Sequence, residues 1–362
     1  LAALLFLGYP QVATQATTPK NDLFSAVVGV IGVFFILEFK HSGRREHAAL
    51  AGASIGIAAG SKATIWLLLP GLGFLLLHSA MRQGRLSRVR LATMGVAMLM
   101  GAAVFVSPHL IRTQLATGYP LMREVKLTVD AVSPQSITAN GLRFGFDMIG
   151  AADLPDPAHR RVVDAKRQAE SWLRFSPDVL HAPGSTFGDS RFTFSGGHLT
   201  EEFAWFGVSG LLIFCCMWIT LIWSLRRRRA AWLAYAAVPI AFLAGVLLLL
   251  RWQPWSGRFI TTAMMLAIPL GLKGVALAVS RQRRIVRRLA WAVLCALAIS
   301  GSFVALLQNR NKPLMPVERM RTVWRLSREE QRCRWVPGNV ALVRFLNSIP
   351  PSRIGVFSAG TN

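Results

Sequence analysis

Long apolar segments, separated by short polar ones, run through most of the chain. Apolar runs of roughly one membrane span cover 22–39, 91–111, 203–225, 230–250, 259–279 and 289–307. A helix that crosses a bilayer needs about 20 apolar residues. The pattern therefore predicts six membrane-spanning helices at these positions.

A further apolar stretch, 48–80, is too long for one regular crossing and is interrupted by Gly-Ser-Lys at 60–62. Two short crossings that meet at this interruption would return the chain to the side from which it came. The first would be only about 20 Å long at 1.5 Å per residue, so neighbouring helices must shield it. Gly52, Gly56 and Gly60 recur every four residues and form a small-residue face that permits close helix packing.

These segments predict an all-α polytopic membrane protein with about eight membrane helices, preceded by one truncated helix. Its expected parts are N-terminal membrane helices in 1–111, an extracytoplasmic loop in 112–202, C-terminal membrane helices in 203–307, and an extracytoplasmic tail in 308–362. The last residues of the tail have the pattern of a strand and a turn, which predicts the start of a small α/β region. Both ends of the chain are expected to be truncated.

The extracytoplasmic loop is expected to hold two juxtamembrane helices. The first covers 138–149. The second covers 159–175, where one helical face carries Val162, Ala165, Ala169, Trp172 and Leu173. The residues that fall outside this apolar face are Arg161, Lys166, Arg167 and Glu170. We predict that this second helix lies along the membrane surface.

Four clusters rich in arginine and lysine lie between apolar segments, at 40–47, 82–90, 226–229 and 281–288. Because basic loops stay in the cytoplasm, all four clusters predict the same cytoplasmic face. They hold fifteen of the 24 net positive charges, so the charge indicates topology and no nucleic acid partner. A composition that is 53% hydrophobic excludes a soluble globular or disordered protein. The conspicuous polar motifs then share the outer face, which is typical of a membrane enzyme that works there.

The motif TPKND at 18–22 opens one of the predicted helices. Its residues fit an ordinary helix start, with Thr18 as the cap, Pro19 in the first turn and Asp22 at the positive helix end. A second interpretation takes Lys20 and Asp22 together. At the rim of a membrane site, a carboxylate can bind a metal ion or order a hydroxyl, and a lysine can hold a phosphate.

Two other cations, Lys62 and Arg258, also have a structural and a ligand-binding interpretation. Lys62, between the two short helices, is either an anchor that extends to the interface or a ligand for an anion. Arg258 opens a spanning helix, where the helix dipole disfavours a cation, so a bound anion nearby would explain it. Its neighbours Trp252 and Trp255 are typical of the aromatic belt at a membrane interface.

The segment GGHLTEEFAWFG at 196–207 opens another helix at the same face. Glu201 and Glu202 suit the positive end of a helix dipole. His198 and Glu202 are four residues apart and can share a metal ion, but two ligands do not make a site.

Three of these motifs resemble the bacterial GT-C superfamily of membrane glycosyltransferases, the relatives of protein O-mannosyltransferases and of the lipid A aminoarabinose transferase. They are TPKNDL at a helix start, GIAAGSKAT between two short helices and WQPWSGRF before a late helix. The tail, with NRNKPLM, SREEQ and SRIGVFS, also looks like the outer C-terminal segment of some bacterial members. The likeness extends through most of the chain, and each motif is short, so it points to the superfamily and to no particular subfamily.

The resemblance implies transfer of a sugar from a polyprenyl-phosphate donor to an extracytoplasmic acceptor, with inversion, in the bacterial inner membrane. The acceptor would be a glycolipid, a polysaccharide or a protein. Asp22 matches the second acidic position of the family, and Lys62 and Arg258 match basic positions near the donor phosphate. Lys20 is a further candidate for binding the donor phosphate, and the candidates for lining the site are His198, Glu201, Glu202 and Trp255.

The same resemblance places the principal catalytic acid of the family before Leu1. We therefore nominate no base in this chain and expect the chain alone to be inactive. The resemblance implies no certain cofactor, and a divalent metal ion is an open alternative.

Two other function classes stay open. An O-antigen polymerase or ligase also has many helices, a large outer loop and arginines that grip a lipid-linked sugar. The short helices around Lys62 and the Asp22 motif favour the transferase. A transporter or flippase would need ionisable residues deep inside its helices, whereas Glu38 and Lys273 lie near predicted cytoplasmic helix ends.

Overall fold

The computed structural model divides into two compact units, Leu1–Ala305 and Leu306–Asn362. The described residues are 1–16, 21–82, 88–118, 128–150, 153–154, 156–173, 180, 185–187, 192, 199–200, 204–309, 314–315, 322–327, 330–331, 341, 344–345 and 348. The described part of the second unit contains the short 3-10 helix η3 (Val323–Arg325). The candidate site lies in the first unit.

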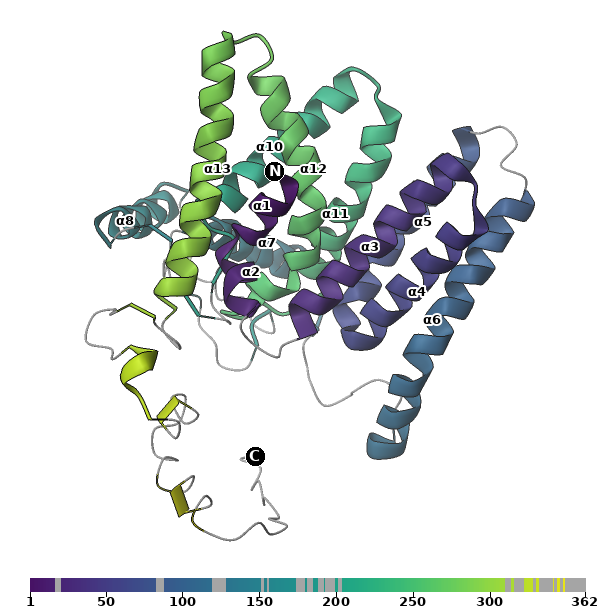
Figure 1. The fold of residues 1–362 in the computed structure, drawn as a ribbon, viewed down its shortest axis with the longest axis horizontal. Coiled ribbons are helices and arrows are strands. Elements are labelled where there is room, and N and C mark those ends of the chain that lie inside the picture. Colours follow the sequence, from purple (N-terminus) through teal and green to yellow (C-terminus); the bar gives the residue numbers. More distant parts are fainter. Residues whose placement is uncertain are drawn as a thin grey trace. The chain divides into compact units, whose positions relative to one another are not determined.

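The first unit is built from helices (Figure 1). In chain order they are α1 (Ala2–Leu7), α2 (Pro10–Gln15), α3 (Asn21–Ser42), α4 (Arg45–Ser61), η1 (Ala63–Leu68), α5 (Leu69–Arg82), α6 (Arg88–Thr117), α7 (Pro134–Met148), α8 (Asp156–Leu173), α10 (Gly207–Arg226), α11 (Ala230–Leu249), η2 (Ser256–Phe259), α12 (Thr261–Ala278) and α13 (Arg284–Leu307). The described residues form no strand, only the isolated bridges Thr128–Leu250 and Thr186–Trp252.

Six of these segments are long and apolar enough to cross a membrane. They are Asn21–Ser42, Gly95–Ala116, Gly207–Arg226, Ala230–Leu249, Thr261–Ala278 and Arg284–Leu307. Their positions agree with the six apolar runs, so the prediction of a mostly helical chain with membrane-length helices is confirmed. The count of eight crossings stays a prediction. So does the α/β region, because its predicted strand lies outside the described residues.

The predicted interruption at 60–62 is confirmed. α4 ends at Ser61, and Lys62 has an extended backbone with φ −155° and ψ 121°. η1 and α5 then lead back, so that the start of α4 and the end of α5 lie at the same end of the helices in Figure 1. Both α3 and α6 pack against the short α4. Neighbouring helices therefore shield it, as the sequence predicts.

Glycines bring α4 and α6 into backbone contact. A Cβ atom built on Gly56 would lie 2.4 Å from the Cα of Ala102, and one on Gly101 would lie 2.6 Å from the backbone nitrogen of Ala53. Such distances leave no room for a side chain. The small-residue face predicted for this segment is therefore the face that meets α6, and it sets how closely the two helices approach.

The described parts of the basic clusters gather at one end of the helices, which we call the basic end. The α3–α4, α10–α11 and α12–α13 turns and the adjoining ends of α5 and α6 lie there, in the upper part of Figure 1. The starts of α3 and α12 and the end of α4 lie at the opposite end, which we call the site end. This arrangement agrees with the common face predicted for the four clusters.

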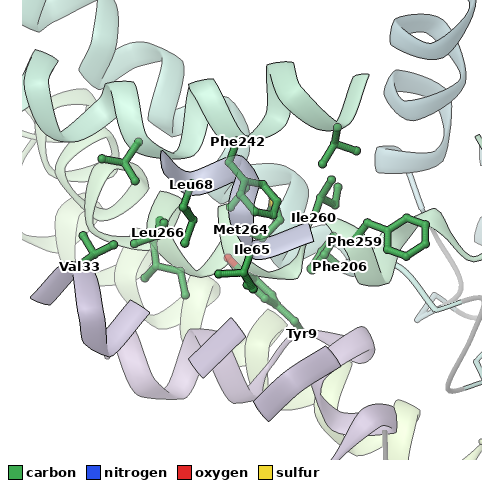
Figure 2. Packing of buried hydrophobic residues seen from close by; sticks show 14 of the residues in the cluster. Tyr9, Val33, Ile65, Leu68, Phe206, Phe242, Phe259, Ile260, Met264 and Leu266 are labelled. Atoms are coloured by element: carbon green, nitrogen blue, oxygen red, sulfur yellow. The ribbon is translucent and has the colours of Figure 1, made fainter. Parts of the chain in front are cut away.

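Apolar side chains fill the space between α3, η1, α11 and α12 (Figure 2). Those at most 1% exposed include Val33, Ile65, Leu68, Phe242, Met264 and Leu266. Helices inside a bilayer associate through close packing, because lipid tails are as apolar as the side chains. This core and the glycine contacts therefore hold the helix ends that form the candidate site.

We expect Gly56→Ala to lower the melting temperature of the protein, because the new methyl group must displace the α6 backbone. Gly73 of α5 is the matched control, since a Cβ there meets nothing within 4 Å. Alanine is favoured over glycine inside a helix by about 0.5–1 kcal/mol, so Gly73→Ala should preserve or raise stability. Thermal unfolding of both variants in one detergent measures the contrast. An unchanged melting temperature for Gly56→Ala would contradict the close approach of α4 and α6.

Candidate functional site

Three predicted site residues from distant parts of the chain meet at the site end. Lys62 Nζ donates a hydrogen bond to the Asp22 carboxylate and forms an ion pair with it. The same Nζ donates to the backbone carbonyl oxygen of Arg258 over 3.3 Å. The Phe259 ring contacts both cations, with its centre 4.9 Å from Lys62 Nζ and 5.4 Å from the guanidinium carbon of Arg258. Residues 22, 62 and 258 therefore lie together, and we call them the candidate site.

Local backbone structure places each of these side chains. Asp22 lies in the first turn of α3, where the helix dipole stabilises a carboxylate. Lys62 is the extended residue between α4 and η1. Asn21, at the start of α3, donates a hydrogen bond to the carbonyl oxygen of Ser61 and so joins α3 to the end of α4. Arg258 lies in η2, directly before α12. Two helix starts and one helix end thus converge on the site.

Among the described residues, the site holds two cations, Lys62 and Arg258, and one carboxylate, Asp22. The side chains of Asp22 and Lys62 are 7% and 13% exposed, so their ion pair is largely removed from solvent. Among the described residues, no carboxylate is paired with Arg258, and its buried Nε has no hydrogen-bond partner. A buried donor without an acceptor is costly. An anion bound beside Arg258 would supply both the acceptor and the missing negative charge.

A second group of buried polar residues holds the segment that leads to Arg258. Trp252 Nε1 donates to Asp147 Oδ2 over 2.9 Å, and the guanidinium carbon of Arg143 lies 5.9 Å from the centre of the Trp252 ring. Lys166 of α8 is 3% exposed and interacts electrostatically with Asp147. We call these four residues the α7 cluster. It joins α7, α8 and the segment before η2.

Arg143 is fully buried and connects several backbone segments. Its Nε and Nη2 donate to the carbonyl oxygen of Leu180 over 2.9 and 2.6 Å, and its Nη1 donates to Ser185 Oγ over 2.9 Å. Nη1 also donates to Asn140 Oδ1 over 3.2 Å, while Asn140 Nδ2 donates to the carbonyl oxygen of Leu250 over 3.0 Å. Arg143 therefore has partners for all three of its nitrogens and is a structural residue. Sequence reasoning missed it.

Desolvation dominates the acid–base properties of the α7 cluster. Burial raises the pKa of Asp147 to about 7, while the Trp252 hydrogen bond and the charges of Lys166 and Arg143 act in the opposite direction. Burial lowers the pKa of Arg143 to about 10, and it also lowers the pKa of Lys166. Burial therefore favours the protonated form of the Asp147 carboxyl group relative to a solvent-exposed aspartate.

Two interpretations from the sequence are wrong. Trp252 is not an interfacial belt residue, because it is 3% exposed and its indole N–H is bonded to the buried Asp147. The apolar face predicted for 159–175 is also wrong at two positions: Lys166, placed outside it, is buried under the electrostatic influence of Asp147, whereas Ala165, placed on it, is exposed.

Of the other candidate residues, the structure describes only Trp255. Trp255 packs edge-on against Phe187, with ring centres 6.0 Å apart, and its carbonyl oxygen accepts from the Arg258 N–H over 3.4 Å. The candidates outside the described residues are Lys20, His198, Glu201 and Glu202, whose roles stay predictions. Within the described ranges, no group of three or more His, Cys, Asp or Glu side chains could hold a metal ion.

Comparisons with known proteins assign no family to this geometry. The chain matches no known protein family, no characterised protein and no solved structure. The likeness to GT-C glycosyltransferases therefore rests only on the three short motifs and the tail segments.

We expect Asp147→Asn to remove a pH dependence of stability. A carboxyl group whose pKa rises from 3.8 to about 7 on folding stabilises the folded state at low pH, and this contribution is lost as the pH rises towards 7. The melting temperature of the unmodified protein should therefore fall relative to that of the variant between about pH 4 and 7. Thermal unfolding in detergent across this range measures the difference.

Asp130→Asn is the control for this experiment, because Asp130 is exposed in its ion pair with Arg251. Its pH profile should run parallel to that of the unmodified protein. Parallel profiles for Asp147→Asn as well would mean that Asp147 is ionised throughout this range.

Proposed function

We propose that this protein is an integral membrane glycosyltransferase that moves a sugar from a polyprenyl-phosphate donor to an extracytoplasmic acceptor, with inversion of the anomeric carbon. The observation that carries the proposal is the convergence of Asp22, Lys62 and Arg258 at one end of a set of membrane-length helices. The acceptor classes are a glycolipid, a polysaccharide or a protein.

The reaction requires a site that stabilises a leaving phosphate. The acceptor hydroxyl attacks the anomeric carbon, a new carbon–oxygen bond forms, and the bond to the phosphate oxygen of the lipid breaks. The phosphate gains negative charge as it leaves, and preorganised cations stabilise such charge. We assign this role to Lys62 and Arg258, with Asp22 holding Lys62 in position. The proton of the acceptor goes to a base that we assign to no described residue.

The proposed orientation follows from the charge distribution. The positive-inside rule puts the basic end in the cytoplasm. The site end then lies on the extracytoplasmic side of the bacterial inner membrane. A lipid-linked donor would enter from the bilayer, so its phosphate would lie at the level of the helix ends where Arg258 is found.

We expect Lys62→Gln and Arg258→Gln each to weaken the binding of polyprenyl phosphate to the purified protein by about tenfold or more, since each removes a charge-assisted contact. Arg161→Gln is the control, because Arg161 is an exposed cation on α8. Titration with polyprenyl phosphate measures the three affinities. Unchanged affinity in both site variants would contradict the assignment of Lys62 and Arg258 to the donor phosphate.

Loss of one partner from a buried ion pair can unfold a protein. The double variant Asp22→Asn/Lys62→Gln therefore accompanies the single variants, since it removes both charges and keeps similar side-chain shapes. A stable double variant that still fails to bind polyprenyl phosphate separates loss of the site from loss of the fold. Because the chain alone is expected to be inactive, transfer of radiolabelled sugar is measured in membranes that contain the full-length parent, where it should collapse in Asp22→Asn. If sugar is transferred only from pyrophosphate-linked oligosaccharide donors, the protein is a polymerase or ligase.

The orientation can be tested with single cysteines in a variant whose four native cysteines are replaced by alanine. Ala165 on α8 and Arg227 at the basic end are both exposed. With an impermeant thiol reagent added outside intact cells, Ala165→Cys should be labelled and Arg227→Cys should not. Arg227→Cys should become reactive after the cells are permeabilised. The reverse pattern would place the site end in the cytoplasm and exclude the proposed donor chemistry.

A further inference from the structure

An apolar groove of about 470 Å³ lies between α3, α11 and α12 and takes no part in the proposed reaction. Val30, Val33 and Leu37 line it from α3, and Trp232 lines it from α11. Its volume is in the range of ~300–1,000 Å³ that is typical of ligand sites. Phe34, another lining residue, is 53% exposed, so the groove opens on the outer surface of the helices. For membrane-length helices, that surface faces lipid.

The polar atoms of two lining side chains are bonded to nearby backbone. The Tyr235 hydroxyl donates to the carbonyl oxygen of Leu266 over 3.0 Å. His41 Nδ1 lies 2.8 Å from the carbonyl oxygen of Leu37, to which it donates. Between Val30 and Leu37 the α3 wall is about 10 Å long, at 1.5 Å per residue, and purely apolar. Such a wall suits a hydrocarbon chain and has no side-chain hydrogen-bonding group for a sugar or a peptide backbone.

One end of the groove reaches the basic end of the helices. His41 lines the groove there, Lys40 precedes it, and the exposed residues Arg226–Arg229 directly precede α11. Glu38 and Glu46, on α3 and α4, offset only part of this positive charge. A hydrocarbon chain in the groove would therefore have its polar end beside an excess of cations.

The packed core separates this groove from the candidate site. Val33 and Leu266 form part of the groove wall and are each 1% exposed. Figure 2 shows Ile65 and Met264 between these two residues and Phe259, which belongs to the candidate site. The groove and the proposed donor-phosphate site therefore lie apart, towards opposite ends of the helices.

We propose that the groove binds an anionic phospholipid of the cytoplasmic leaflet. One acyl chain lies between α3, α11 and α12, and the headgroup phosphate lies among Lys40, His41 and Arg226–Arg229. The cytoplasmic leaflet is rich in anionic lipids, which basic side chains attract at the membrane surface. The apolar wall, the opening towards lipid and the charge at one end together specify this occupant. The proposal uses the predicted orientation and does not depend on sugar transfer.

Native mass spectrometry of the purified full chain tests the proposal with phosphatidylglycerol and phosphatidylcholine that carry the same acyl chains. We expect the unmodified protein to retain phosphatidylglycerol about tenfold more strongly, because only this headgroup carries net negative charge. Lys40→Gln/His41→Gln should remove the preference. Ala231→Trp should abolish retention, because Ala231 lines the groove and is exposed, so the larger ring fills the groove without entering the core.

Two matched variants serve as controls. Arg281→Gln/Arg284→Gln removes two exposed cations away from the groove, and Ala296→Trp adds an indole to the exposed face of α13. Both should retain phosphatidylglycerol as the unmodified protein does. Equal retention of the two lipids, or equal losses in test and control variants, would overturn the proposal. So would displacement of phosphatidylglycerol by polyprenyl phosphate, since the groove would then belong to the donor. Failure of sugar transfer alone leaves this result unaffected.

Discussion

A buried charge needs a counter-charge nearby, and this constraint organises the site end of the molecule. Lys62 lies at the point where α4 stops, with little exposure to solvent. Asp22 supplies the counter-charge from the start of α3, and the carbonyl oxygen of Arg258 adds a contact from the segment before α12. Because one ammonium group bonds to both, the positions of three helix ends depend on a single side chain.

Two layers of packing support that side chain. On the membrane side, the glycines of α4 let it approach α6 and Gly32 of α3 lets it approach α3, so the short helix ends where Lys62 can reach its partners. On the loop side, the α7 cluster holds the segment that carries Arg258 through the indole of Trp252. In the first layer, glycines without side chains allow close backbone packing, and in the second, buried hydrogen bonds hold the backbone. The first layer positions Lys62, and the second positions the segment that carries Arg258.

Much of this arrangement could be predicted from the sequence, because apolar length and glycine spacing are local properties. The six long helices, the interruption before Lys62 and the small-residue face of α4 all follow from neighbouring residues. The approach of Lys62 to Asp22 was an expectation drawn from their common membrane face, and the two side chains form an ion pair. The place of Arg258 was implied only by the resemblance, and its carbonyl oxygen accepts a hydrogen bond from Lys62.

The α7 cluster was missed for a physical reason. Charged residues in a juxtamembrane helix look like a solvated face, and only tertiary contacts show that Arg143, Asp147 and Lys166 are buried. One signal was present: Arg143 and Asp147 are four residues apart, on the same side of a helix that was predicted. The partner Trp252 lies 105 residues from Asp147, and no local pattern indicates such a contact.

The sequence separations within the candidate site bear on how the protein is made. Lys62 and Asp22 are 40 residues apart, whereas Lys62 and Arg258 are 196 apart. Chains are synthesised from the N-terminus, and their earlier parts fold first. The ion pair can therefore form while the ribosome is still producing the second half, but the cation beside it arrives only with η2. A ribosome-bound chain that ends before η2 thus holds a neutral pair without the excess positive charge, and competence to bind an anion appears late in biosynthesis.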